Sequence, residues 1–175
     1  VLSLTLVLPL ITMANCKLEA GRATYDLMVN GSHAGSIKET NQAPEPGQYQ
    51  MTAVTTAKFL FIKDTITERS SGLINAKTGV TAQSYQINDT RSNKPVSIIF
   101  DNAKQQANLN NNGVKSVMST HAQTQDNLSY KLALRWALIA GQEPKSMTIN
   151  VVDQNIKKNY VPLSFTLTSL GHQTL

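Results

Sequence analysis

The sequence predicts a mainly β fold, in which a curled, half-barrel-like antiparallel sheet wraps around one principal α-helix. Short segments of alternating apolar and polar residues recur along the chain, and turn signals rich in Asn and Gly separate them, as in a meandering sheet. One longer segment, residues 126–141, repeats its apolar residues with a helical period instead. The abundance of Thr, Ser, Asn and Gln suits strands that expose one face to water.

Alternation and turn signals define the expected strands. The Asn30-Gly31 pair is the strongest hairpin signal, because both residues accept the positive φ of a type I′ turn. Gly72 is expected to end a strand. The apolar run at residues 59–62 is either a buried strand or a turn whose aromatic side chains enter the core. We expect strands at residues 23–29, 32–40, 48–57, 65–70, 80–87, 95–100, 105–109, 114–118, 146–152 and 160–169.

Residues 126–141 are expected to form the helix, about 24 Å long. Asp126 is placed to cap its free N–H groups, and Gly141 to close its C-terminal end. Since its apolar residues cover much of its circumference, we expect the helix to be enclosed on several sides. The predicted buried stripe consists of Leu128, Leu132, Arg135, Trp136 and Ile139, widened by Leu134 and Leu138.

Residues 1–14 carry no charge and are predicted to be a signal peptide remnant whose basic n-region is missing. The run is shorter than the roughly 20 apolar residues of a membrane span. Cleavage after Ala14 leaves residues 15–22 as a linker and residues 23–175 as a single β-rich domain, incomplete at its C-terminus. The predicted location is therefore the periplasm. A buried N-terminal strand is the alternative interpretation of residues 1–14.

Cys16 allows a second interpretation of the N-terminus. A cysteine just after an apolar run is the lipidated residue of bacterial lipoproteins, which makes an outer-membrane lipoprotein the alternative to a secreted protein. Asn15 stands where such a signal has Gly or Ala. Peripheral membrane association is expected only if Cys16 is lipidated. Because Cys16 is the only cysteine, no disulfide can form within the chain.

Charge and motifs exclude several classes of function. The Lys and Arg residues behind the net charge of +5 are spread along the chain without a basic cluster, so nucleic-acid binding is not expected. The histidines, His33, His121 and His172, lie in different segments without metal-ligand spacing, and we predict no metal and no cofactor. There is neither a nucleophile elbow nor a Gly-rich phosphate loop. We therefore expect a protein that is not an enzyme; a hydrolase with a site assembled from distant strands is the alternative.

Aromatic side chains form the candidate binding site. Phe59, Phe61, Tyr130 and Trp136 are either ordinary core residues or the apolar lining of a concave sheet. In the second case they would receive a lipid or another hydrophobic ligand. We expect this binding function, and the alternative is a structural or assembly factor of the cell envelope that contacts other envelope proteins through exposed strand edges.

Several motifs resemble the domain of unknown function 3108 family of secreted bacterial proteins. The opening is TYDLMVNGSHAG, residues 24–35, and Gly47-Gln48-Tyr49 follows. Residues 67–70, TERS, and residues 130–135, YKLALR, are similar to a later strand and to the helix of the family. The resemblance implies a β-rich envelope protein with no established activity and with further C-terminal strands, and it transfers no catalytic residue. By analogy of fold alone, such sheets also resemble periplasmic lipoprotein carriers.

Overall fold

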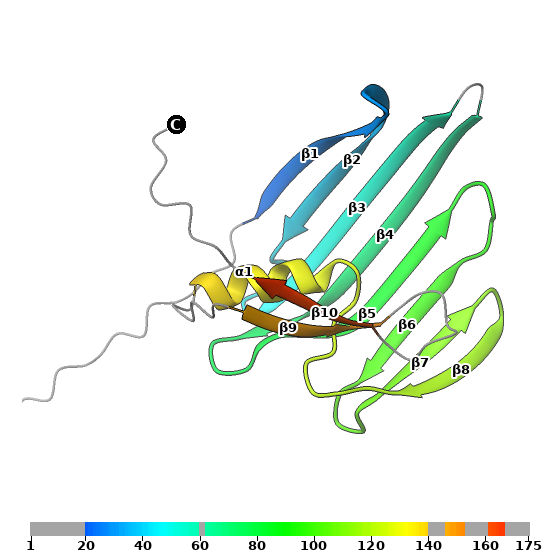
Figure 1. Cartoon of the computed structure of the whole chain (residues 1–175). Helices are drawn as coiled ribbons and strands as arrows, with labels where there is room; N and C mark the ends of the chain where they lie inside the picture. The colour runs from blue at the N-terminus through cyan, green and yellow to red at the C-terminus, as the bar shows by residue number, and fades with distance from the viewer. Residues whose placement is uncertain (1–19, 60–61, 140–145, 153–160, 167–175) are drawn as a thin grey trace, which may run out of the picture.

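The computed structural model describes residues 20–59, 62–139, 146–152 and 161–166 (Figure 1). The strands are β1 (Gly21–Val29), β2 (Ser32–Gln42), β3 (Gln48–Phe59), β4 (Ile62–Asn75), β5 (Gly79–Asp89), β6 (Val96–Asp101), β7 (Gln106–Asn111), β8 (Val114–Ser119), β9 (Ser146–Val151) and β10 (Val161–Thr166), and the helix is α1 (Ser129–Ile139).

Strands β1 to β8 form one antiparallel sheet in which each strand pairs with the next along the chain. The sheet is curled and open, with β1 and β8 at its two edges, which confirms the predicted fold class. Helix α1 and the β9–β10 hairpin lie together on one face of the sheet (Figure 1). The segment before α1 joins this hairpin, because Gln125 N donates to Asn150 O at 2.8 Å and Val152 N donates to Gln125 O at 2.9 Å.

Tight turns join neighbouring strands where the sequence predicts them. Asn30 and Gly31 have φ values of 49° and 78°, and they connect Val29 directly to its partner Ser32. This is the predicted type I′ geometry, whose twist matches that of the flanking strands. Asn112 and Gly113 repeat it between β7 and β8, with φ values of 51° and 88°.

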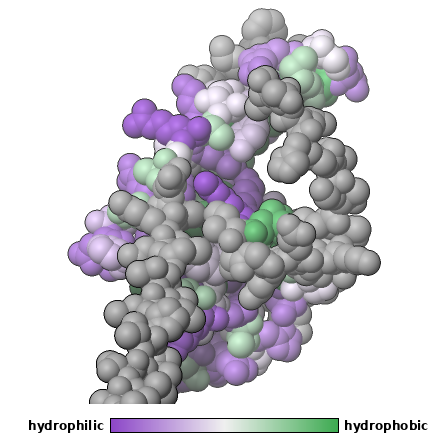
Figure 2. Space-filling view, turned by 90° about the vertical axis from the view of Figure 1, so that its left-hand side faces the viewer, coloured by the Kyte–Doolittle hydropathy of each residue, from purple (hydrophilic) through white to green (hydrophobic). Residues whose placement is uncertain are grey.

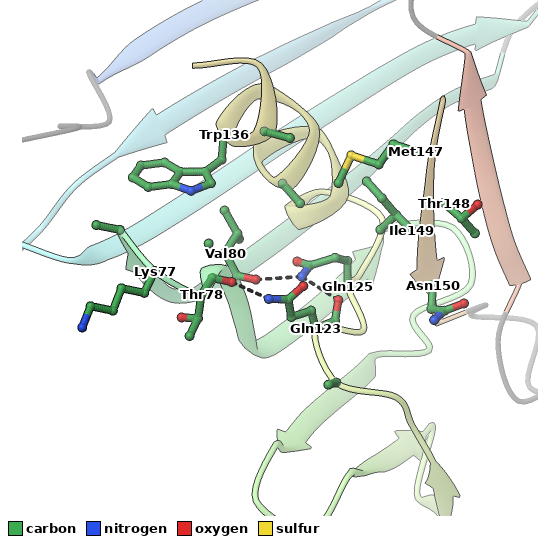
Figure 3. Close-up of a pocket in the computed structure, with 15 residues that line it drawn as sticks. Lys77, Thr78, Val80, Gln123, Gln125, Trp136, Met147, Thr148, Ile149 and Asn150 are labelled. Carbon is green, nitrogen blue, oxygen red and sulfur yellow. Dashed lines mark hydrogen bonds between the residues drawn. The ribbon is translucent and has the colours of Figure 1, made fainter. Parts of the chain in front are cut away.

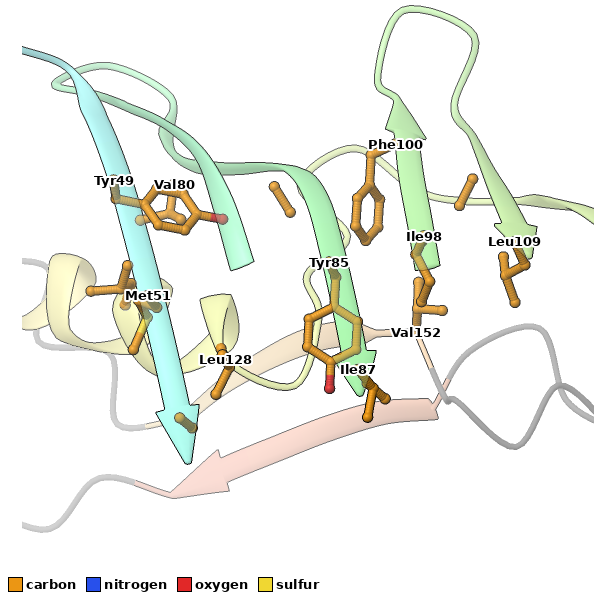
Figure 4. Packing of buried hydrophobic residues seen from close by; sticks show 14 of the residues in the cluster. Tyr49, Met51, Val80, Tyr85, Ile87, Ile98, Phe100, Leu109, Leu128 and Val152 are labelled. Carbon is orange, nitrogen blue, oxygen red and sulfur yellow. The ribbon is translucent and has the colours of Figure 1, made fainter. Parts of the chain in front are cut away.

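The core lies between the sheet and α1, on the side that we call the core face (Figure 4). Alternate residues of each strand point to this face, and each large apolar side chain buried there contributes about 1.5 to 3 kcal/mol to folding. Opposite it, the outer face carries polar residues such as Thr52, Arg69 and Gln86, which occupy paired positions on β3, β4 and β5. The labelled core residues are Tyr49, Met51, Val80, Tyr85, Ile87, Ile98, Phe100, Leu109, Leu128 and Val152.

The prediction that a strand ends at Gly72 is wrong. Gly72 lies inside β4, beside a register shift between Ser71 and Gly72. A Cβ at this position would be 2.8 Å from Cε1 of Tyr49 and 2.1 Å from the carbonyl oxygen of Thr81. The glycine is therefore a point of close packing within a strand and not a terminator.

The N-terminal boundary of the sheet also differs from the prediction. Gly21 and Arg22, assigned to a linker over residues 15–22, belong to β1 and pair with Asn41 and Thr40. The reason is that β2 continues to Gln42 and offers these residues backbone partners. The predicted signal remnant at residues 1–14 and Cys16 lie outside the described residues, as does Gly141.

Helix α1 begins three residues after Asp126, at Ser129. It buries Leu132, Trp136 and Ala137, but Arg135 is exposed and Leu138 is 45% exposed. The expectation of a helix enclosed on several sides is therefore wrong at Leu138. Physically, α1 lies against one face of the sheet, so the residues turned away from the sheet meet solvent.

Candidate functional site

A buried polar network fixes the start of α1 on the sheet. Asp126 Oδ1 accepts hydrogen bonds from the backbone N–H groups of Leu128 at 2.8 Å and Ser129 at 2.9 Å. In return Ser129 Oγ accepts from Asp126 N at 2.8 Å, which makes a reciprocal cap. The predicted capping role of Asp126 is confirmed. The other carboxylate oxygen, Oδ2, accepts from Ser70 Oγ of β4 at 2.7 Å, so the cap also ties α1 to the sheet.

Burial dominates the electrostatics of this network. Asp126 is fully buried, and burial raises the pKa of its carboxyl group, although hydrogen bonds from Ser129, Ser70 and Leu128 act in the opposite direction. Burial also raises the pKa of Tyr49, whose hydroxyl lies 3.2 Å from Ser70 Oγ, and the charge of Asp126 adds to the effect. The Tyr49 phenol is therefore neutral and serves only as a hydrogen-bonding group.

The raised pKa of Asp126 has a consequence for stability against pH. A carboxyl group with a higher pKa in the folded state stabilises the fold below its unfolded pKa of about 3.9, and this contribution is lost as the pH rises through the folded pKa. We therefore expect the stability of D126N relative to wild type to increase with pH above about 4. Urea unfolding of both proteins across this range measures the difference. A stability difference between D126N and wild type that stays constant with pH would contradict a raised pKa of Asp126 in the folded state.

The middle of α1 rests on the turn between β4 and β5. A Cβ placed on Gly79 would lie 3.4 Å from Cδ1 of Trp136, so the indole ring lies beside this glycine and any larger residue here would touch it. The side chains of Leu132 and Trp136 enter the core. Two pockets lie beside the helix, one on each of its flanks.

The first of these spaces, which we call the β1–α1 pocket, has a volume of about 260 Å³. Its apolar wall consists of Ala23, Tyr25, Met51 and Leu132, and its polar side chains are Glu39, Asn41, Lys131 and Arg135. Gly21, Arg22 and Thr40 complete the lining. Since side chains alternate along a strand, those of Arg22 and Thr40 belong to the outer face, and these two residues contribute mainly backbone to the pocket.

Charge at the β1–α1 pocket is unevenly balanced. Lys131 forms an ion pair with Glu39. Burial disfavours the charged ammonium group, but the hydrogen bond and the charge of Glu39 outweigh it and raise the pKa of Lys131. Arg135 is exposed and has no carboxylate partner among the residues that the structure describes. An apolar wall, buried at Met51 and Leu132, thus lies beside one cation that is neutralised and one that is not.

The second space, the Trp136 pocket, has a volume of about 180 Å³ and lies on the other flank of α1 (Figure 3). Trp136 and Ile149 line it together with the turn before β5. Gln125 Nε2 donates to the carbonyl oxygens of Val80 at 2.9 Å and Gln123 at 2.8 Å, and Gln123 Nε2 donates to Thr78 O at 2.5 Å. These bonds join the segment before α1 to the start of β5 beside the pocket.

Three of the four aromatic residues predicted as a joint lining lie in the described part of the chain, and the structure places them apart. Trp136 lines its own pocket, whereas Tyr130 is partly buried on α1 and lines neither pocket. Phe59 pairs with Ile62 at the opposite end of β4 from the Asn75–Gly79 pair that supports Trp136. At about 3.3 Å per residue the two ends of β4 are about 40 Å apart, so Phe59 and Trp136 cannot share a site. Phe61 lies outside the described residues.

The sequence prediction also missed most of the pocket-forming residues. Glu39 and Lys131 are 92 residues apart, and no local pattern links them. Tyr25 was predicted only as a strand residue, yet it is 50% exposed at the mouth of the β1–α1 pocket. The alternation of side chains along β1 could have identified two of these residues, because Ala23 and Tyr25 are two positions apart and share the strand face that points toward α1.

Comparison with known proteins identifies no relative: no family model, curated protein or solved structure matches the chain. The resemblance to the domain of unknown function 3108 family therefore stays a prediction. Among the described residues, no group of three or more His, Cys, Asp or Glu side chains is arranged to hold a metal ion. Within the same residues, no helix combines the length and the hydrophobicity needed to cross a lipid bilayer.

Proposed function

We propose that the protein binds a single-chain amphiphile with an anionic head group in the β1–α1 pocket. The observation that carries this proposal is the juxtaposition of the buried apolar side chains Met51 and Leu132 with the unneutralised cation Arg135. An alkyl chain would gain about 25 cal/mol for each Å² of apolar surface that it buries against this wall. The head group would remain at the exposed rim, within reach of Arg135.

The size of the pocket narrows the class of ligand. Pockets that enclose drug-sized molecules have volumes of about 300 to 1,000 Å³. At about 260 Å³, the β1–α1 pocket is smaller. It suits one alkyl chain better than a phospholipid with two chains. We therefore favour a fatty-acid-like ligand, and we propose a binding function without a chemical reaction.

Calorimetric titration with dodecanoate, below its critical micelle concentration, tests the proposal. We expect saturable binding with a negative heat-capacity change, which is the signature of apolar burial. Dodecyltrimethylammonium, which has the same chain and the opposite charge, should bind more weakly, and acetate should not bind. Equal binding of the two long-chain ions, or the absence of binding by dodecanoate, would contradict the proposal.

Charge variants sharpen the test. R135Q should weaken dodecanoate binding about fivefold, equivalent to roughly 1 kcal/mol for an exposed charge pair. E39Q should tighten it, since it removes the only carboxylate that lines the pocket among the described residues. R69Q is the matched control, because Arg69 is exposed on the outer face. A change of the same sign in R135Q and E39Q would show that charge does not select the ligand.

An envelope assembly factor remains the alternative function, and one observation favours it. Both edge strands carry exposed large apolar residues, including Tyr25 and Val29 on β1 and Val114 and Val117 on β8. Exposed strand edges are where partner proteins add strands. In-cell cross-linking would distinguish this alternative by a specific protein adduct.

The proposed location is the periplasm, and it rests on the uncharged run of residues 1–14. Lipidation at Cys16, with peripheral membrane attachment, stays the alternative. Mass spectrometry of protein isolated from a bacterial envelope fraction separates the two, because a lipidated Cys16 adds the mass of its acyl chains.

A further inference from the structure

The outer edge of β1 carries an unusual pattern of charge. Its charged residues, Arg22 and Asp26, are of opposite sign and lie on the outer face, two positions on either side of Thr24. Arg22 has no ion-pair partner among the described residues, and the Asp26 side chain is 71% exposed with only His33 Nε2 nearby, at 3.4 Å. A two-fold axis through the position of Thr24 and perpendicular to the sheet would bring Arg22 of one strand opposite Asp26 of a second copy, so the charge pattern is self-complementary.

We propose that two copies of the chain associate by antiparallel pairing of β1 with β1, centred on Thr24. In this register Arg22 of each copy lies opposite Asp26 of the other, so two equivalent ion pairs form on the outer face. On the core face Tyr25 of each copy lies opposite Ala23 of the other. The two sheets, each with β1 at one edge, become one continuous sheet.

Exposed apolar surface supports β1 as the contact. Tyr25, Met28 and Val29 are 50%, 56% and 52% exposed, and they account for three of the eight exposed large hydrophobic residues among the described ones. On the side of the molecule seen in Figure 2, hydrophobic surface occurs in small separate areas among hydrophilic residues. Pairing through β1 would cover Tyr25 and satisfy the outward backbone groups of an edge strand.

The opposite edge does not offer the same complementarity. The only charged residue of β8 is Lys115, so pairing of β8 with itself would form no ion pair. Registers of β1 that are centred on other residues of the strand do not pair Arg22 with Asp26. They place each of these residues opposite an uncharged residue or opposite the same residue of the other copy, which carries the same charge. Thr24 is therefore the centre that the charges select. A single pair of short strands is a small interface, and we expect a reversible dimer that forms at high concentration.

Sedimentation velocity of the chain over a concentration series tests the pairing. Wild type should shift from monomer to dimer, whereas R22E and D26R should each stay monomeric, because each places like charges opposite one another. The R22E/D26R double variant should dimerise again, since the ion pairs form with reversed polarity. A wild type that is monomeric throughout, or single variants that dimerise like wild type, would overturn the proposal.

Disulfide trapping tests the register itself. In a C16S background, T24C places two thiols at the pair centre, where the Cα atoms of facing residues are about 4.5 to 5.5 Å apart, within the disulfide range. V29C, at an exposed position on the same strand, would separate the thiols by about 30 Å. We expect T24C to cross-link under mild oxidation and V29C to remain reduced. Equal cross-linking of both, or none with T24C, would overturn the register.

Discussion

Replacement of Asp126 with alanine is expected to lower the free energy of unfolding by about 2 to 4 kcal/mol. The carboxylate accepts hydrogen bonds from the N–H groups of Leu128 and Ser129 and from the hydroxyl of Ser70, and all of these groups are buried. Alanine would leave them without an acceptor in a place that water does not reach. Loss of a helix cap alone costs about 1 kcal/mol, and each stranded buried group adds to it.

The asparagine variant is the matched control. The side chain introduced by D126N keeps an oxygen for the two N–H groups, and asparagine caps helices as well as aspartate does. Its amide nitrogen would face Ser70 Oγ, which can accept a hydrogen bond in place of donating one. We expect D126N to lose no more than about 1 kcal/mol near neutral pH. Chemical denaturation measures both variants, and similar losses in the two would show that the network does not hold α1.

Gly72→Ala is expected to destabilise the protein by about 2 to 3 kcal/mol. The new methyl group would lie 2.1 Å from the carbonyl oxygen of Thr81 and 2.8 Å from the ring of Tyr49. Tyr49 is itself buried and joined to Ser70, so its ring cannot move aside without disturbing the polar network beneath α1. Overpacking of a rigid site is relieved only by shifts of the backbone.

Gly21→Ala is the control for this substitution. Gly21 lies in β1, and a Cβ there would meet no atom within 4 Å. Its change in stability should stay within about 0.5 kcal/mol. Thermal unfolding of the two variants provides the comparison. Equal melting temperatures for G72A and G21A would show that close packing at Gly72 does not constrain the sheet.

Features that depend on neighbours in sequence were predictable. The hairpin at Asn30-Gly31 follows from the backbone preferences of these two residues, and the cap at Asp126 from a side chain that reaches N–H groups two and three residues later. The meandering order of strands follows from turns at short spacing, because strands joined by tight turns must pair with each other.

Features that depend on distant residues were not predictable. Whether Gly72 ends a strand or admits an aromatic ring is decided by Tyr49, on another strand. The separation of Phe59 from Trp136 was one such feature, because β3 and β4 are long and their hairpin places Phe59 far from α1. The β1–α1 pocket depends on contacts between distant segments. The register of β1 and β2 places Ala23 opposite Glu39, and the position of α1 over the sheet brings Lys131 to Glu39.

Photolabelling with a diazirine-bearing dodecanoate tests the central claim most directly, because it reports where the alkyl chain lies. After irradiation and digestion, mass spectrometry should find the label in β1 around Ala23 and Tyr25 and in α1 around Leu132. An excess of unlabelled dodecanoate should reduce this labelling. R135Q should reduce this labelling, and R69Q should not. Labelling that is confined to the outer face, or that unlabelled dodecanoate does not displace, would contradict an amphiphile site between β1 and α1.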